Sequence, residues 1–139
     1  MLSRNLALVL SISMLVAPPA AADDEPAKDV SMVALLANPR AFEGSRIELK
    51  AYFGAGRIAP ALFLSRDHAE INDRSSSFLL TDESQGFIEK HCSGHYVRLE
   101  ARFIRHNDTD HAFFYMIDDV TALDIYKDGK SQQCWPRRR

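Results

Sequence analysis

Two segments of this sequence alternate strictly between apolar and polar residues, and each begins shortly after a glycine, Gly44 in the first and Gly94 in the second. A period of two is typical of a β-strand with one buried and one solvated face. A small residue at the centre of each segment favours the sharply bent strands of a narrow barrel. We therefore expect two long barrel strands. Their core-facing residues are expected to be Ile47, Leu49, Ala51 and Phe53 in the first, and Val97, Leu99, Ala101 and Phe103 in the second.

The similarity of the two segments raises the alternative of an internal duplication. The chain that follows each segment differs, however, since the first leads into a Gly-rich loop and the second into a turn rich in His and Asp. We therefore interpret the two segments as strands with the same role in a single domain.

Shorter elements are expected around these strands. Asp29 or Ser31 is expected to cap an N-terminal helix with Val30, Val33, Ala34 and Ala37 on its apolar face, and Asn38-Pro39 is expected to end it. Five strands with a helix between the third and fourth is the order of an OB-fold. The sequence therefore predicts a mainly β protein: an OB-fold-like five-stranded barrel with an N-terminal helix and a helix between strands three and four. The remaining expected elements are a loop over 54–60, strands over 61–64 and 76–80, a helix over 85–91, a hairpin loop over 106–110 and a last strand ending near residue 126.

Four short motifs carry a resemblance to a group of small exported bacterial OB-like proteins. They are strand and turn patterns, so the resemblance implies the fold over about residues 30–126 and no particular chemistry. The motifs are Leu35-Leu36-Ala37-Asn38-Pro39, Phe42-Glu43-Gly44-Ser45-Arg46-Ile47-Glu48-Leu49, Leu62-Phe63-Leu64-Ser65 and Gly94-His95-Tyr96-Val97-Arg98-Leu99-Glu100.

The N-terminus has the three regions of a secretory signal peptide. A positive charge at Arg4 precedes an apolar run over 6–16, and Ala20 and Ala22 occupy the −3 and −1 positions of a cleavage site. The alternative is a membrane anchor, but eleven apolar residues rise only about 17 Å as a helix, short of the hydrocarbon layer. We therefore expect a signal peptide over 1–22, a flexible leader over 23–29 and a domain over 30–139, located in the periplasm or secreted, without stable membrane insertion.

Composition limits the classes of partner. The 139 residues are 46% hydrophobic and 26% charged, which is typical of a globular domain. Seventeen basic and nineteen acidic residues give a net charge of −2, so no strong field attracts nucleic acid. We expect a monomer that binds a protein or a cell-envelope component, and no nucleic acid.

Cys92 and Cys134 are the two cysteines of the chain. An exported protein meets an oxidising compartment, where such a pair normally forms a disulfide. The alternative is a redox or metal-binding pair, but the chain has no Cys-x-x-Cys motif. We therefore predict a structural Cys92–Cys134 bridge that holds the C-terminal tail.

A cluster of histidines and aspartates offers the chemistry of a metal site. Two imidazoles and two carboxylates on one hairpin tip have the ligand types that zinc or copper binds. The alternative is a solvated turn, since Asn, Asp, Thr and His are common in turns. A second cluster, His91 and His95, flanks a cysteine that the disulfide would remove from ligation. The candidate metal ligands are His106, Asp108, Asp110 and His111.

No catalytic arrangement is recognisable in the sequence. Ser75, Ser76 and Ser77 lack a nucleophile-elbow motif, and Gly54-x-Gly56 lacks the residues of a phosphate loop. We therefore expect no enzymatic activity and no cofactor.

The outer barrel face and its adjoining loops could bind a ligand through aromatic and guanidinium groups. The alternative is a solvated strand face on which Glu48, Lys50 and Glu100 pair with the arginines. On the first interpretation the protein is a periplasmic or secreted non-enzymatic binding module. The alternatives are a periplasmic metal-binding protein and an inhibitor or immunity-type partner of an exported enzyme. The candidate ligand-binding residues are Tyr52, Arg57, Arg66, Arg102, Arg105, Phe113 and Tyr115.

Overall fold

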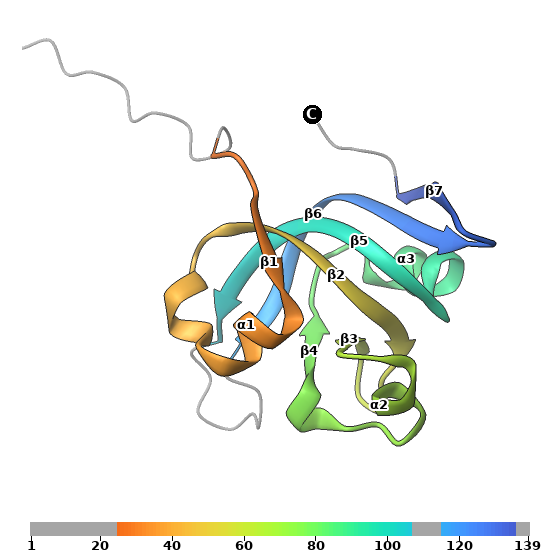
Figure 1. Ribbon diagram of the computed structural model, residues 1–139, viewed down its shortest axis with the longest axis horizontal. Helices are drawn as coiled ribbons and strands as arrows, with labels where there is room; N and C mark the ends of the chain where they lie inside the picture. The colour runs from red at the N-terminus through yellow and green to blue at the C-terminus, as the bar shows by residue number, and fades with distance from the viewer. Residues whose placement is uncertain (1–24, 107–114, 136–139) are drawn as a thin grey trace, which may run out of the picture.

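The computed structural model describes residues 25–106 and 115–135. Seven strands and five short helical segments follow one another along these residues (Figure 1). Their bounds are β1 (Lys28–Ser31), α1 (Met32–Ala37), η2 (Pro39–Phe42), β2 (Arg46–Ala55), β3 (Pro60–Phe63), α2 (Arg66–Glu70), η3 (Arg74–Ser76), β4 (Ser77–Leu80), α3 (Gln85–Cys92), β5 (His95–Arg105), β6 (Tyr115–Lys127) and β7 (Lys130–Trp135).

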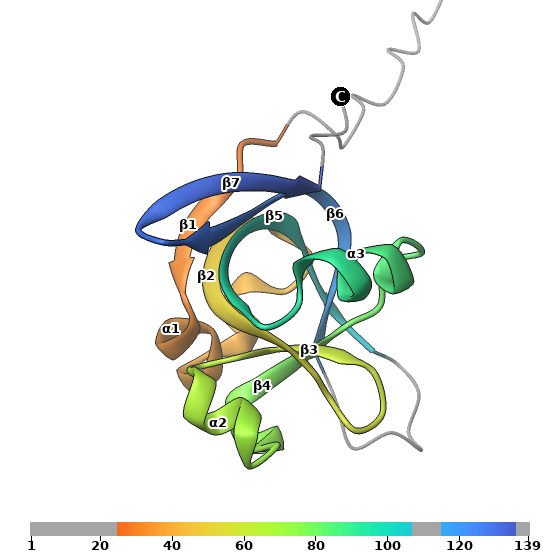
Figure 2. The same cartoon turned by 90° about the vertical axis from the view of Figure 1, so that its right-hand side faces the viewer.

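Five of the strands close a barrel in the order β2-β3-β4-β6-β5, with β5 pairing back onto β2 (Figure 2). The barrel is mixed, because β4 and β6 run parallel while the other neighbouring barrel strands are antiparallel. Helix α3 lies between β4 and β5, the third and fourth barrel strands. The predicted mainly β class is confirmed, and the mixed five-stranded barrel is consistent with an OB-fold.

The two alternating segments form β2 and β5, which pair along most of their length with Leu49 opposite Leu99 and Ala51 opposite Val97. The residues predicted to face the core are all buried. Both central alanines lie among them, and larger side chains there would crowd the bent strands. The period-two pattern therefore predicts the inner wall of the barrel correctly.

The chain enters the barrel through a strand that the sequence pattern did not predict. Residues Lys28–Ser31 pair in parallel with 47–50 of β2, and Val30 is buried. Ser31 then caps α1, its hydroxyl accepting a hydrogen bond from Ala34 N at 3.1 Å. The buried residues of α1 are Met32 and Leu35, whereas Val33, predicted to lie on the apolar face, is exposed. Because Val30 belongs to a strand, the apolar face of the helix is rotated from the predicted one.

The C-terminal segment forms a hairpin. Asp128 and Gly129 both have positive φ, 52° and 72°, and join β6 to β7 in a two-residue turn. The predicted Cys92–Cys134 disulfide is present, with Cα atoms 5.9 Å apart, and it ties β7 to the end of α3. The C-terminal part is therefore held both by strand pairing and by a covalent bond.

Candidate functional site

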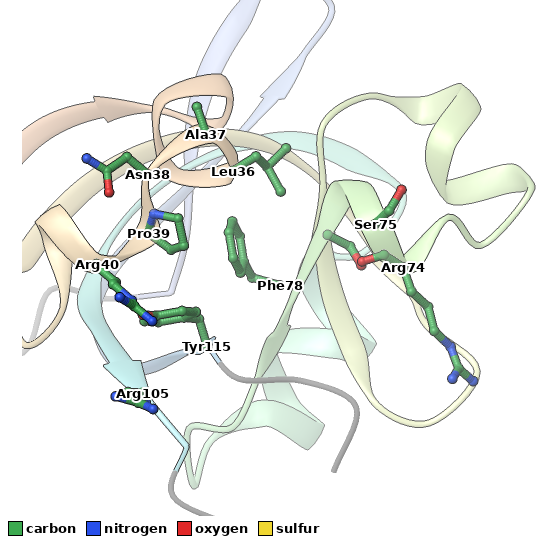
Figure 3. Close-up of a pocket in the computed structure, with 11 residues that line it drawn as sticks. Leu36, Ala37, Asn38, Pro39, Arg40, Arg74, Ser75, Phe78, Arg105 and Tyr115 are labelled. Carbon is green, nitrogen blue, oxygen red and sulfur yellow. The ribbon is translucent and has the colours of Figure 1, made fainter.

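An open groove of about 520 Å³ lies between the α1–η2 segment and the start of β4, where the end of β5 and the start of β6 also meet it (Figure 3). Segments far apart in the sequence meet here because the barrel closes. The groove is lined by Leu36, Ala37, Asn38, Pro39, Arg40, Arg74, Ser75, Ser77, Phe78, Arg105 and Tyr115.

The floor of the groove is continuous with the barrel core through a row of aromatic rings. Phe78 meets the buried Phe103 edge to face, with ring centroids 5.1 Å apart. Phe103 in turn stacks on Tyr115 at 5.3 Å, the ring planes inclined by only 2°. Because Phe78 and Tyr115 both pack on the buried Phe103, they lose little freedom when a ligand covers them, so the floor is preorganised for binding.

The first wall is the turn between α1 and η2. Asn38 N donates to Ala34 O at 3.1 Å, which ends α1, and Ala41 N donates to Asn38 O at 3.2 Å. Pro39 occupies the first position of η2 and has no backbone N–H to offer. This wall therefore presents side chains, above all Arg40, and no free amide from these three residues.

The opposite wall is η3 and the start of β4. The Asp73 carboxylate caps η3, accepting hydrogen bonds from Ser75 N at 3.0 Å and Ser75 Oγ at 2.6 Å. Hydrogen bonds from the Ser75 and Ser76 side chains hold the pKa of Asp73 below its ordinary value of 3.8. Ser77 Oγ donates to Arg74 O at 3.2 Å. The hydroxyls of Ser75 and Ser77, the two serines that line the groove, are thus used within this wall.

Two guanidinium groups border the groove without an acidic partner in the described part of the chain. Within residues 25–106 and 115–135, no carboxylate lies within 4.0 Å of the guanidinium nitrogens of Arg40 or Arg105. Both side chains lie on the side of Tyr115 in Figure 3, whereas the Arg74 side chain runs away from Phe78. Arg40 and Arg105 are therefore the cationic groups on which a ligand site would depend.

The predicted ligand-binding residues do not form one cluster. Arg105 and Tyr115 line the groove, where Arg105 is paired with Tyr115 across β5 and β6. Tyr52 packs instead against Tyr96, with ring centroids 5.2 Å apart, and Arg66 N donates to the Tyr96 hydroxyl at 3.5 Å. Arg66 also pairs with Glu70 in α2.

The remaining predicted residues lie elsewhere. Arg57 is in the β2–β3 loop, where its backbone N donates to Asn72 Oδ1 at 3.3 Å. Arg102 donates to Gly44 O at 3.0 Å and faces Asp119, so it belongs to a polar cluster of the barrel wall. Phe113 lies outside the described residues. Sequence reasoning missed Arg40 and Phe78, which only the closed barrel brings to Arg105.

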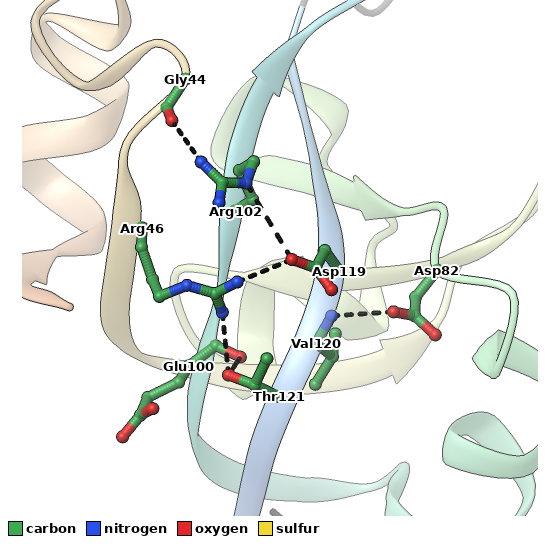
Figure 4. Close-up of polar contacts among 8 residues, drawn as sticks. All are labelled: Gly44, Arg46, Asp82, Glu100, Arg102, Asp119, Val120 and Thr121. Atoms are coloured by element: carbon green, nitrogen blue, oxygen red, sulfur yellow. Dashed lines mark hydrogen bonds and ion pairs between the residues drawn. The ribbon is translucent and has the colours of Figure 1, made fainter. Parts of the chain in front are cut away.

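That polar cluster lies at an irregularity in β6 (Figure 4). Opposite Ala101 the pairing of β5 with β6 shifts register, and Asp119 adopts a positive φ of 47°. Its carboxylate accepts a hydrogen bond from Arg46 Nη2 at 2.7 Å, and Arg46 Nη1 donates to Thr121 Oγ1 at 2.9 Å. Arg46 is 6% exposed, although it belongs to the polar half of the alternation, which is expected to face solvent. The shift in register turns Asp119 toward Arg46, which explains how a charged residue is accommodated there.

The shift in register also exposes a backbone group that a second carboxylate satisfies. Val120 N donates to Asp82 Oδ2 at 2.7 Å, while Asp82 Oδ1 accepts from Ser84 N at 2.7 Å. Asp82 is buried and joins the segment before α3 to β6. These contacts fasten strands, so we assign the cluster a structural role.

Arg98 shows the cross-strand pairing that is expected of arginines on a solvated strand face. Its guanidinium lies 2.9 Å from Asp124 and 3.9 Å from Glu48, on the neighbouring strands. The hydrogen bond to Asp124, followed by the charge of Glu48, raises the pKa of Arg98 above its ordinary value. Cross-strand pairing therefore accounts for this part of the outer face.

The candidate metal ligands fall mostly beyond the described part of the chain. His106 is described, but Asp108, Asp110 and His111 lie outside the described residues. Among residues 25–106 and 115–135, no three His, Cys, Asp or Glu side chains gather as a metal site would require. In the other histidine cluster, His91 packs on Phe87 with ring centroids 4.3 Å apart, and His95 Nδ1 is 3.0 Å from Ser93 O.

Comparison of the chain with protein-family models, curated proteins and solved structures finds no match. In the described ranges, no helix is long and apolar enough to span a membrane. What the fold and the groove define is a disulfide-linked, five-stranded mixed β-barrel with a cationic, aromatic groove at one edge. Its function has to be inferred from that geometry.

Proposed function

We propose that this protein is an exported, non-enzymatic binding module whose groove receives a protein or cell-envelope ligand that carries negative charge. The observation that supports this proposal is the pairing of two guanidiniums, Arg40 and Arg105, with a preorganised aromatic floor. Guanidinium and aromatic groups together are the residue types enriched where proteins bind other molecules.

The groups in the groove favour binding over catalysis. Among residues 25–106 and 115–135, the lining of the groove includes no Asp, Glu, His, Cys or Lys, the side chains that most often act as acids, bases or nucleophiles. Ser75 does donate to a carboxylate, but hydrogen bonds lower the pKa of Asp73, which makes it a weak base near neutral pH. The described lining therefore supports a role in recognition.

Export is supported by two independent features. The Cys92–Cys134 bridge is the kind of covalent bond that persists in an oxidising compartment. The N-terminal sequence carries the charge, the apolar run and the small residues of a cleavable signal. We therefore place the binding activity in the periplasm or outside the cell.

Amide NMR shifts of the oxidised, exported protein, measured against fractions of cell-envelope extract, test this proposal. We expect one fraction to shift the resonances of Arg40, Phe78, Arg105 and Tyr115, and the R40Q/R105Q variant to lose these shifts. The matched control is R57Q/R66Q, which removes the same charge from predicted residues outside the groove and should respond as the unmodified protein does.

The proposal is wrong if no fraction shifts the groove resonances, or if the shifts gather around Tyr52 and Arg66. Circular dichroism of both variants checks that the barrel is intact, since all four arginines are on its surface segments.

A further inference from the structure

The charge of the groove is opposite to that of the chain. The protein as a whole has more acidic than basic residues, yet the described residues that line the groove include three arginines and no acidic residue. In the part of the chain that is described, two of these arginines, Arg40 and Arg105, also have no carboxylate within 4.0 Å. Such a local concentration of positive charge is complementary to an anionic ligand.

The groups available to hold that anion are guanidinium side chains. Phosphate sites commonly add backbone N–H groups at a helix start or in a nest. Here Asn38 N and Ala41 N are used within the α1–η2 turn, and Pro39 has no N–H. The planar fork of arginine fits a carboxylate or a phosphate with two parallel hydrogen bonds. Because Asn38 N and Ala41 N add no amide nest for a phosphate, the two guanidiniums suit the separate carboxylates of an acidic segment at least as well.

The anion must also carry an apolar part, because the centre of the groove is apolar. Figure 3 shows Phe78 between Leu36, Pro39 and Tyr115, with Arg40 and Arg105 on the Tyr115 side. The groove is open along one side, so it covers one face of its ligand and does not enclose it. Small-molecule sites usually bury most of their ligand, whereas an extended chain can lie along an open groove.

We infer that the groove binds an extended acidic peptide segment of a partner protein, with carboxylates at Arg40 and Arg105 and an apolar side chain on Phe78. This inference rests on the proposed function, which it narrows to one class of ligand. The partner segment contributes alternating acidic and large apolar residues. The guanidiniums bind the acidic residues, and the aromatic floor contacts the apolar ones.

A synthetic peptide tests the inference directly. The probe is an acetylated, amidated Glu-Asp-Phe-Asp-Leu-Glu-Glu, titrated into the oxidised protein while amide shifts are recorded. The matched peptide has Gln and Asn in place of Glu and Asp. Each lost charge-assisted hydrogen bond weakens binding by about tenfold or more. We therefore expect the acidic peptide to shift Arg40, Phe78, Arg105 and Tyr115, the neutral peptide to bind at least about tenfold more weakly, and R40Q/R105Q to do the same.

The control variant R57Q/R66Q should bind the acidic peptide as the unmodified protein does. Equal binding of the acidic and neutral peptides overturns the inference, as does binding that survives in R40Q/R105Q.

Vesicles containing phosphatidylglycerol are a separate experiment. Binding to these vesicles without binding to the peptide overturns the inference, because the ligand is then a lipid headgroup and not an acidic segment. In that case, or if an envelope fraction shifts the groove while the peptide does not, the proposed function stands. If neither peptide, vesicle nor envelope fraction shifts the groove, the proposed function fails as well.

Discussion

The arginines of this protein lie in two contrasting environments, the barrel wall and the groove. Arg46 is buried in the wall, 2.7 Å from the Asp119 carboxylate, and donates a further hydrogen bond to Thr121. Arg40 and Arg105 border a groove and face no carboxylate in the described segments. The contrast is informative because an unpaired charge costs free energy when it is buried. A charge in contact with water needs no partner in the folded protein and remains available to a ligand.

The polar cluster of the barrel wall and the groove therefore have different roles. In the wall, a register shift in β6 positions Asp119 so that β2, β5 and β6 are joined by polar contacts. In the groove, the cationic groups stand beside aromatic rings that the core already holds in place. Changes in the wall should alter stability, and changes in the groove should alter binding.

Removal of the disulfide should have the largest effect, and it should change the free energy of unfolding without changing the groove. Replacing both cysteines in C92A/C134A opens a loop with a sequence separation of 42 residues. The chain-entropy model gives a loss of about 4 kcal/mol for a loop of this size. Urea unfolding should show that loss, while the groove resonances keep their native shifts under conditions where the protein is folded. A loss of the groove resonances would mean that the disulfide, which lies on α3 and β7, also shapes the groove.

A smaller loss is expected when the wall arginine loses its partner. Asp119→Ala leaves the Arg46 charge buried, and because Asp119 itself is 45% exposed, we expect a loss of about 1 to 3 kcal/mol. Arg46→Met removes the charge together with its need for a partner, so it should cost less than Asp119→Ala in the same urea titration. The reverse order would contradict the structural role given to this ion pair.

The groove arginines should have almost no effect on stability. R40Q/R105Q removes two charges that pair with no described carboxylate, so the free energy of unfolding should stay within about 0.5 kcal/mol of the unmodified value. Denaturation midpoints measured beside those of Asp119→Ala give the comparison directly. A loss as large as that of Asp119→Ala would place these arginines among the structural ones.

The smallest effect concerns the pH response of the groove wall. The pKa of Asp73 is lowered in the folded protein, so its contribution to stability is present above the pKa of the unfolded chain and is lost as pH falls through the folded value. Carboxyl NMR should therefore give Asp73 a midpoint below 3.8, and Ser75→Ala should raise it toward that value. An unchanged midpoint in Ser75→Ala would show that the serine hydroxyl does not hold the carboxylate.

The sequence was sufficient to predict the barrel because its information is local. Strict alternation around Leu49 and Leu99 is repeated at every second residue, and the glycines mark where each long strand begins. The strand β7 was not predicted, although Asp128-Gly129 after a strand-like run is a hairpin signal. In contrast, β1 has only four residues and a single buried side chain, Val30, which gives no readable period.

The groove was harder to predict because it depends on contacts between distant segments. Arg105 and Tyr115 flank the hairpin loop that the sequence predicts as part of a ligand face, but their neighbours Arg40 and Phe78 come from the segments before β2 and after η3. No spacing in the sequence links these four residues. Arg46 shows the same limit, since its alternation predicted solvent and only the register shift in β6 explains its burial.

The pairing of β2 with β5 also determines when the molecule can fold. Residue 46 pairs with residue 102, so β2 can pair with β3 on one edge early, but its other edge stays unpaired with β5 until more than fifty further residues are available. Contacts this far apart along the chain slow folding, typically to milliseconds or seconds for barrels of this kind. The Cys92–Cys134 bond, with a sequence separation of 42, is a further long-range contact, and we expect it to form after folding has brought its two ends together.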